Sequence, residues 1–201
     1  MKSMTTLGVL TLIFFISTPV WAQTGNEKKE PLPLLTVASV DLKRYGGKWY
    51  EIARYPNKFQ KNCVGNTTAT YTLKENNRLE VVNECLEKDG SVDRAKGEAR
   101  IVDKTTNAKL EVRFAPSLLS FIPAVWGDYW IIDLADDYSY AAIGDPDRKY
   151  FWILSRTPKL DDAVYQDILR RAEKLGFDPA KVEKTPQNVE AVKGAVIEKQ
   201  E

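Results

Sequence analysis

Polar and apolar residues alternate along several short stretches of the chain. In residues 109–114 (Lys-Leu-Glu-Val-Arg-Phe) every second residue is apolar, and the residues between them are charged. Residues 78–84 follow the same pattern, although Val82 places one apolar side chain on the polar side. Because successive side chains of a β-strand point to opposite faces, this period of two predicts strands with one solvated face.

Eight strands are expected, with turn-like residues between them. They span residues 49–55, 64–73, 78–84, 94–102, 109–114, 128–134, 138–144 and 149–155, and a further short strand is allowed at 177–184. Many short strands without helices between them favour one antiparallel sandwich or barrel over βαβ units. Closing eight strands into a barrel would remove the edges and leave room inside for one small ligand.

One helix is expected after the eighth strand. Asp161 and Asp162 can cap its start, and Gly176 can end it in the left-handed conformation. Between these signals apolar residues recur at helical spacing, at Val164, Ile168, Ala172 and Leu175. A single apolar stripe gives the helix one packed face, so we expect it on the outer wall of the barrel.

The first 22 residues have the pattern of a secretory signal peptide. Lys2 precedes an almost unbroken apolar run at 7–16, and Val20 and Ala22 are the small residues that a signal peptidase reads. The run is too short for a comfortable membrane span, which disfavours a retained anchor. We expect a mature start at Gln23 and export to the periplasm or beyond the cell, without lipid attachment, because no Cys lies near the cleavage point.

The remaining chain divides into three parts. A leader segment at 23–40 mixes charge and Pro without any period. The strands and the helix occupy one domain at 41–185. The tail at 186–201 is mostly small, polar and charged, and the pattern assigns it no role.

The composition excludes several kinds of chemistry. The 201 residues include no His, which removes Ser-His-Asp and Cys-His nucleophiles and His-ligated zinc or haem. Losing Lys2 with the signal peptide takes the 29 basic residues to 28, equal to the 28 acidic ones, so no basic patch for nucleic acid is indicated. We expect no metal, no cofactor and no nucleic-acid partner, and the pattern predicts no oligomeric state.

The two Cys residues flank a predicted hairpin. A polar turn joins the strands at 64–73 and 78–84, so folding there brings Cys63 and Cys85 roughly opposite each other. In an oxidising compartment the simplest expectation is a disulfide. The alternative is the catalytic thiol of an isomerase built on the same barrel, although no His is present to activate it.

Three segments resemble the motifs of the lipocalin family. Residues 47–54 (GKWYEIAR) resemble its G-x-W segment, residues 137–140 (DYSY) its second motif, with Asp136 where Thr is common, and residues 147–158 (DRKYFWILSRTP) its third. All three motifs in the right order make the match specific. The resemblance covers 41–185 and is closest to the branch of bacterial lipocalins, plant temperature-induced lipocalins and apolipoprotein D.

This resemblance implies an all-β fold, an eight-stranded antiparallel up-and-down barrel with the C-terminal α-helix packed on its outside. It gives Trp49 and Arg156 structural roles. Trp49 would fill the closed end of the barrel, and the Arg156 guanidinium would pack over it as a cation on an aromatic face. We therefore expect changes at Trp49 to reduce stability rather than to remove ligand binding selectively.

Candidate ligand-binding residues come from two sources. The resemblance to apolipoprotein D points to Tyr71, Asn83, Tyr129 and Trp152, strand alternation adds Leu79, Val81, Leu110, Val112 and Phe114, and Tyr140 completes the set. The alternative for each is simple barrel filling, because side chains can pack small barrels solid. For Asn83 the alternative is a polar residue near water at a strand end.

Residues 116–127 form an unusual connection because they are apolar and carry no charge. The large apolar side chains are Leu118, Leu119, Phe121, Ile122, Val125 and Trp126. An exposed patch of this kind commonly marks a membrane or protein contact. Two interpretations stay open: a peripheral membrane contact, which the resemblance to plant temperature-induced lipocalins implies, or a loop buried over the barrel.

Taken with the resemblance, these patterns predict an exported lipocalin, not an enzyme. It would bind, store or transfer a small hydrophobic molecule, a fatty acid or a lysophospholipid. The alternatives are the thiol-dependent isomerase and an interaction module that docks on an envelope protein through the 116–127 loop.

Overall fold

The computed structural model describes residues 33–188. The expected signal peptide at 1–22 lies outside the described residues, as do 23–32 of the leader segment and 189–201 of the tail. Within 33–188, no helix has both the length and the apolar character needed to span a membrane.

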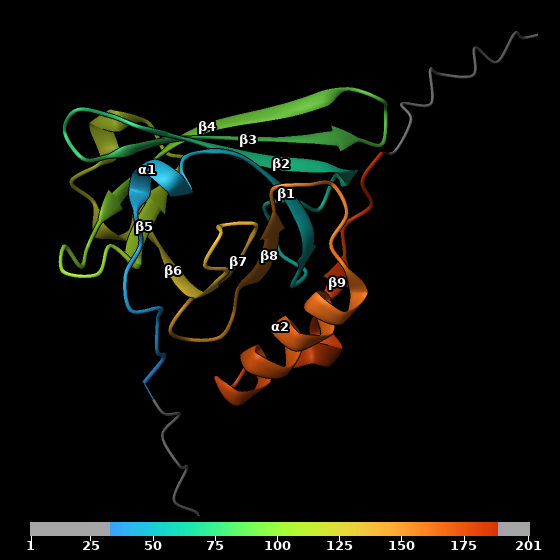
Figure 1. The fold of residues 1–201 in the computed structure, drawn as a ribbon. Helices are drawn as coiled ribbons and strands as arrows, with labels where there is room; N and C mark the ends of the chain where they lie inside the picture. The colour runs from blue at the N-terminus through green and yellow to red at the C-terminus, as the bar shows by residue number, and fades with distance from the viewer. Residues whose placement is uncertain (1–32, 189–201) are drawn as a thin grey trace, which may run out of the picture. The chain divides into compact units, whose positions relative to one another are not determined.

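Eight strands follow one another in antiparallel order around a closed sheet (Figure 1). They are β1 (Gly47–Arg54), β2 (Cys63–Leu73), β3 (Leu79–Glu87), β4 (Val92–Ile101), β5 (Lys109–Arg113), β6 (Gly127–Leu134), β7 (Tyr140–Gly144) and β8 (Phe151–Ser155). Each pairs with its neighbours in sequence, and β8 pairs with β1. The expected eight-stranded up-and-down barrel is confirmed.

The remaining elements are short, except for one helix. They are α1 (Leu42–Tyr45), the 3-10 helices η1 (Ser117–Leu119), η2 (Pro123–Val125) and η3 (Pro179–Lys181), α2 (Asp162–Lys174) and β9 (Glu183–Lys184). β9 pairs with β1, which confirms a short strand near the predicted 177–184. Helix α1 was not predicted; its start is capped by Asp41.

The strands have two differently covered faces, as the alternation predicts. On β6, Tyr129 and Ile131 point into the barrel and belong to the interior cluster around Trp49. Trp130 and Ile132 belong to a second cluster that includes α2. Because a strand that buries both faces cannot alternate between apolar and polar residues, β6 and β7 read as more continuously apolar than β5.

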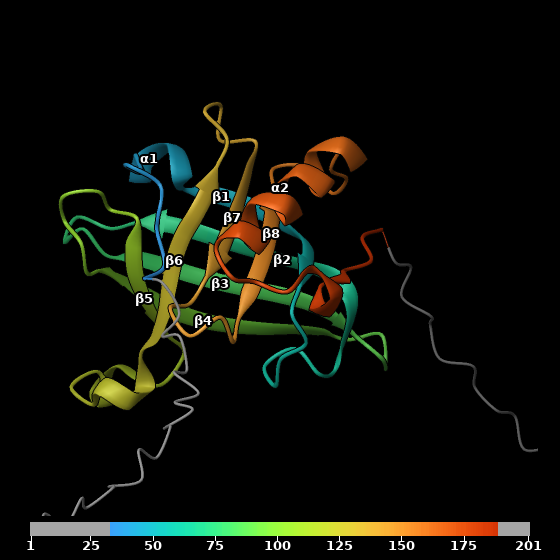
Figure 2. The same cartoon turned by 90° about the horizontal axis from the view of Figure 1, so that it is seen from below.

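Helix α2 lies on the outside of the barrel near β8 and β9 (Figures 1 and 2). The Asp161 side chain accepts hydrogen bonds from the backbone nitrogens of Ala163 and Val164 and so caps its first turn. Its inward stripe is buried against the second cluster, at Tyr165, Ile168, Leu169 and Ala172. The helix ends before Gly176, whose φ of +91° confirms the expected left-handed position.

The starts of β7 and β8 each lie two residues later than predicted, because the turns before them use residues that read as strand formers. β7 begins at Tyr140 rather than at 138, since Tyr138 adopts a φ of +64° in the preceding turn. β8 begins at Phe151 rather than at 149, and Arg148 has a φ of +55°. In both places a left-handed residue, which sequence alternation cannot reveal, ends the connecting turn.

Candidate functional site

One end of the barrel is closed by Trp49 and α1. The indole of Trp49 is fully buried, and its Nε1 donates a hydrogen bond to the carbonyl oxygen of Tyr45, 2.8 Å away. The Arg156 guanidinium lies 3.7 Å from the centre of the Trp49 ring. Its nitrogens donate to four backbone carbonyls, those of Arg44, Tyr45, Lys48 and Tyr138. Trp49 and Arg156 thus join α1, β1 and the β6–β7 turn at the closed end.

Toward the other end the interior opens to solvent by degrees. On the inward side of β4, Ala99 is buried, Gly97 and Ala95 are half-buried, and Asp93 is exposed. On β5, Leu110 is buried, Val112 is half-buried, and Phe114 just beyond the strand is 43% exposed. We call this accessible part the open half; it is bordered by Asn83, Ala95, Gly97, Val112, Phe114 and Trp152.

The structure brings most of the predicted ligand-binding residues to this interior. Tyr71, Leu79, Val81, Leu110 and Tyr129 are buried in the interior cluster below the open half, and Val112 and Trp152 pack against it. Phe114 lies against β4, where a Cβ on Gly97 would come within 2.7 Å of its ring. Only a glycine leaves room there for the Phe114 ring to rest on the inner wall.

Tyr140 is not brought to the interior. It packs with the outer cluster near α2, and its hydroxyl lies 2.9 Å from the donating Nη2 of Arg171. The neighbouring Ala141 belongs to the interior cluster, so the alternation of β7 turns Tyr140 outward. The aromatic character of Tyr140 therefore did not show which face of β7 it occupies.

Three buried tyrosines form a chain of hydroxyl groups below the open half. The hydroxyl of Tyr129 lies 2.6 Å from that of Tyr45 and 2.8 Å from that of Tyr71. Burial raises the pKa of all three phenols, so each is neutral at physiological pH. We call this set the tyrosine triad. Tyr45 was not among the predicted ligand-binding residues, because it lies in α1, outside the predicted strands.

Asn83 faces the open half with an unpaired atom. Its Oδ1 is buried and has no hydrogen-bond partner among residues 33–188. A buried amide oxygen without a donor costs about 1–3 kcal/mol, so this position favours a ligand or water that can donate to it.

A second cluster of polar side chains is centred on the carboxylate of Glu51, which is buried in β1. It accepts hydrogen bonds from Gln60 Nε2 and Thr185 Oγ1, both at 2.5 Å, and lies 3.2 Å from Nε of Arg54. Gln60 in turn accepts from Nε1 of Trp152 at 3.2 Å. Glu51 could have been predicted to share the inward face of Trp49, because it stands two residues later in the same strand and alternate residues of a strand share a face.

Residues after β9 link β1 and β2 beyond the point where these two strands pair. The ladder between β1 and β2 ends at Tyr50 and Thr68. Beyond this point Gln187 Nε2 donates to the carbonyl oxygens of Glu51 and Thr67, at 2.8 and 3.0 Å. The backbone nitrogen of Asn66 donates to the carbonyl of Pro186. The start of the tail, to which the sequence assigned no role, therefore bridges β1 and β2.

Stability is expected to depend on pH through Glu51. Burial raises the pKa of its carboxyl above 4.5, so the folded state holds the proton more tightly than the unfolded chain does. The stabilising contribution of the protonated form is complete below the unfolded pKa and is lost as pH rises through the folded pKa. Glu51→Gln should remove this slope, which thermal unfolding of both proteins across acidic to neutral pH would measure.

The exposed β2–β3 turn offers a matched control for that titration. Glu75→Gln should leave the pH profile of the wild-type protein unchanged, because Glu75 is solvent-exposed. A difference between wild type and Glu51→Gln that stays constant with pH would contradict the assignment to Glu51.

The β5–β6 loop has an exposed side and a packed side. Leu118 is 72% and Phe121 78% exposed, whereas Leu119, Ile122 and Val125 are half-buried. Trp126 turns back, with its Nε1 donating to the carbonyl of Ser120 and its ring 4.2 Å from the Arg100 guanidinium. The loop projects at the opposite end of the strands from α1 (Figure 2). The exposure of Leu118 and Phe121 contradicts the interpretation in which the whole loop is buried over the barrel.

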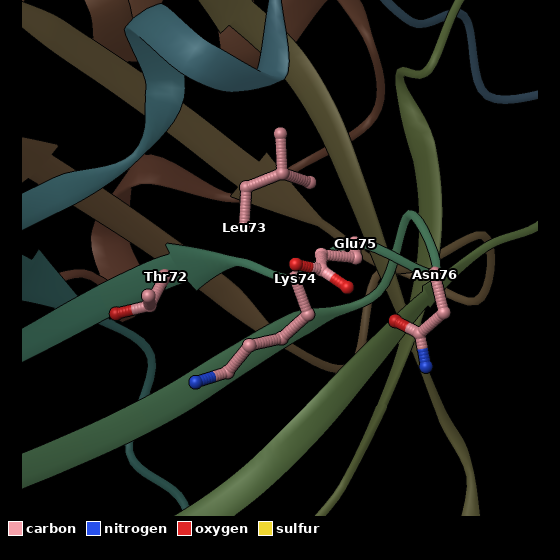
Figure 3. A pocket seen from close by; sticks show the side chains of 5 residues that line it. All are labelled: Thr72, Leu73, Lys74, Glu75 and Asn76. Carbon is pink, nitrogen blue, oxygen red and sulfur yellow. The ribbon is translucent and has the colours of Figure 1, made fainter.

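Two surface hollows lie outside the barrel interior. One follows the β2–β3 turn, at Thr72, Leu73, Lys74, Glu75 and Asn76, where the side chains of Leu73 and Lys74 extend in opposite directions (Figure 3). The other lies between β1 and α2 and includes Ile52, Pro158 and Tyr165. In the described part of the chain, no group of three or more His, Cys, Asp or Glu side chains is placed to hold a metal ion.

The two cysteines are joined in a disulfide, as predicted. Cys63 on β2 and Cys85 on β3 have Cα atoms 5.7 Å apart. They are the only two Cys residues of the sequence, and no free thiol remains. The alternative of a thiol-dependent isomerase thus lacks its nucleophile.

The chain is similar to a set of known proteins. A family model described as a lipocalin-like domain matches residues 40–187. Temperature-induced lipocalin-1 of Arabidopsis thaliana is 41% identical over 165 residues, which cover 81% of this chain and 86% of that protein. The outer membrane lipoprotein Blc of Escherichia coli K12 is 38% identical over 152 residues, 75% of this chain and 81% of its own. Apolipoprotein D of Mus musculus is 36% identical over 156 residues, 73% and 77%.

Solved structures share the same fold at lower identity. Insecticyanin from the tobacco hornworm Manduca sexta aligns with a TM-score of 0.60 and 22% identity, covering 76% of this chain and 84% of that one. The cockroach allergen Per a 4 aligns with a TM-score of 0.58 and 19% identity, covering 77% and 93%. These likenesses support the barrel and its external helix.

Proposed function

This chain belongs to the lipocalin family, whose members generally bind small hydrophobic molecules, and on that premise we propose that it is an exported carrier of a fatty acid or a lysophospholipid. It would bind, store or transfer this ligand without chemical change. The observation that carries the proposal is the graded interior, in which an accessible, largely apolar open half stands above a buried floor. The unpaired Oδ1 of Asn83 supplies a polar contact there.

The binding energy would come mainly from moving apolar ligand surface out of water. Each Å² contributes about 25 cal/mol, and a few polar groups fix the orientation of the ligand. Ala95 brings no large side chain to the inner face of β4, Gly97 leaves room there for the Phe114 ring, and Trp152 adds further aromatic surface. This division between apolar surface and few polar groups suits an amphiphile.

Export is supported by the disulfide, since such bonds persist in oxidising compartments. Both Cys residues of the sequence are used in it, which supports a protein without lipid attachment through Cys. Anchoring is thus a property that we do not transfer from the relative named as an outer membrane lipoprotein.

Filling the open half should weaken ligand binding. Ala95→Trp places an indole inside the barrel, and we expect it to weaken binding by about tenfold or more, because the displaced ligand surface stays in water. Native mass spectrometry of the purified protein would identify co-purified lipid, and fluorescence titration with that lipid would give the affinities. The neighbouring Lys96→Trp, on the exposed face, is the control. Equal binding by both variants would exclude the barrel interior as the site.

A second proposal concerns the exposed side chains of the β5–β6 loop, which favour a peripheral membrane contact. Replacing Leu118 and Phe121 with Asp should reduce the fraction that co-sediments with liposomes by about tenfold or more, since each apolar side chain contributes about 1.5–3 kcal/mol on burial. Val102→Asp, an exposed apolar residue next to the β4–β5 turn, is the matched control. Absence of liposome binding by the wild-type protein would contradict this role and favour docking on a protein of the envelope.

A further inference from the structure

We propose that the tyrosine triad is a subsite for one uncharged hydrogen-bond acceptor, such as the carbonyl oxygen of a ketone, an aldehyde or a protonated carboxyl group. The ligand would enter the barrel with this oxygen first and leave its apolar remainder in the open half. This inference rests on the proposed function, because it assumes that a ligand occupies the barrel interior.

The three hydroxyl groups of the tyrosine triad carry one more proton than the contacts between them use. The hydroxyl groups of Tyr45, Tyr71 and Tyr129 carry three protons, and the two contacts between them use two of these. Whichever way the hydroxyls turn, one proton is left over. Among residues 33–188, these hydroxyls form no hydrogen bond other than the two between them. A buried donor without an acceptor is costly, so the triad is complete only when an acceptor atom reaches it.

The three tyrosines of the triad differ in how far they lie from the open half. Tyr45 is only 1% exposed and lies at the closed end, whereas Tyr71 and Tyr129 keep 5% and 8% of their surface accessible. Tyr71 is cross-strand neighbour to Val81, and the small Ala69 follows on the same inward face of β2. An acceptor that comes from the open half would therefore meet Tyr71 or Tyr129 before Tyr45.

An anionic ligand group is disfavoured at the triad. Burial raises the pKa of each phenol, and the nearby Glu51 carboxyl raises that of Tyr71 further, so a second negative charge there would be costly. The cation nearest to the closed end, Arg156, already donates to four backbone carbonyls. With one spare donor and no free counter-ion, the subsite matches a neutral oxygen better than a carboxylate or a phosphate.

This chemistry separates the two proposed ligand classes. A fatty acid can reach the triad by taking up a proton, since its carboxyl group then becomes neutral. A lysophospholipid carries a phosphodiester that stays ionised, and its acyl-ester carbonyl lies only a few bonds away from that group. Both would remain at the open half and leave the triad unsatisfied. The triad thus favours ligands with a neutral or neutralisable carbonyl.

The experiment compares two ligands that differ in one atom group. A long-chain methyl ketone and the alkene in which a methylidene group replaces the carbonyl oxygen have nearly the same shape. Each would compete with phenylnaphthylamine, an uncharged dye whose fluorescence rises in apolar sites. The proteins are the wild type, the double variant Tyr71→Phe/Tyr129→Phe, and Tyr50→Phe, whose hydroxyl lies on the outer face of β1.

We expect the ketone to bind the wild type and Tyr50→Phe about tenfold more tightly than the alkene, and this advantage to fall to near unity in the double variant. A merely structural effect of the substitutions would weaken both ligands equally and leave their ratio unchanged. A ratio near unity in the wild type, or a ratio that survives in the double variant, would overturn the subsite. If neither ligand nor the dye binds any of the proteins, the proposed function itself is refuted.

Discussion

Replacing Trp49 with Ala is expected to lower the free energy of unfolding by about 3–5 kcal/mol, the usual cost of removing a large buried aromatic side chain. The indole fills the closed end completely, and its Nε1 satisfies the carbonyl of Tyr45. Its loss would also leave the Arg156 guanidinium over an empty space. Urea unfolding followed by circular dichroism would measure the change.

The outer face of β6 offers a control for this substitution. Trp130 is only half-buried and lies under the ammonium group of Lys109, so Trp130→Ala should cost clearly less than Trp49→Ala. Ligand binding to Trp49→Ala, measured at a temperature where the variant stays folded, should be weakened only as far as the fold is loosened. Unchanged stability together with lost binding would contradict the structural role of Trp49.

The strands and α2 could be predicted because local pattern determines them. The alternation at 109–114 places Leu110 and Val112 inward, and the structure has them there. Helix α2 could be predicted from its cap at Asp161 and its apolar spacing. Each of these signals is contained in a few neighbouring residues, so no knowledge of the tertiary structure is needed.

The rest of the site depends on contacts between distant parts of the chain. Tyr45 joins the triad only because Tyr129 lies opposite it, 84 residues later in the sequence. Gln187 bridges Glu51 and Thr67 only because β1 and β2 part at that level. Tyr140 is the opposite case. It was predicted to line the barrel interior because it is aromatic, but its position in β7 turns its side chain outward. In each case the role of the residue depends on strand register or on a distant contact, which residue type alone cannot show.

Removing the disulfide is also expected to lower the free energy of unfolding strongly. The bridge spans a sequence separation of 22 residues, for which the chain-entropy model gives about 3 kcal/mol. It joins the part of β2 where the register with β3 shifts on both sides of Gly65 to the end of β3 that pairs with β4 without a shift. We therefore expect Cys63→Ser/Cys85→Ser to lose about this amount of stability.

Reductant supplies the internal control. The wild-type protein in reductant should fall to the stability of the double variant, and the variant itself should not respond, because it has no bond to break. Thiol titration of the folded, oxidised wild type should find no free thiol, as both cysteines are bonded. If the variant were as stable as the wild type, β2 would be held by its hydrogen bonds alone. In that case the contact between Asn66 and Pro186 would be the stronger restraint on this end of the strand.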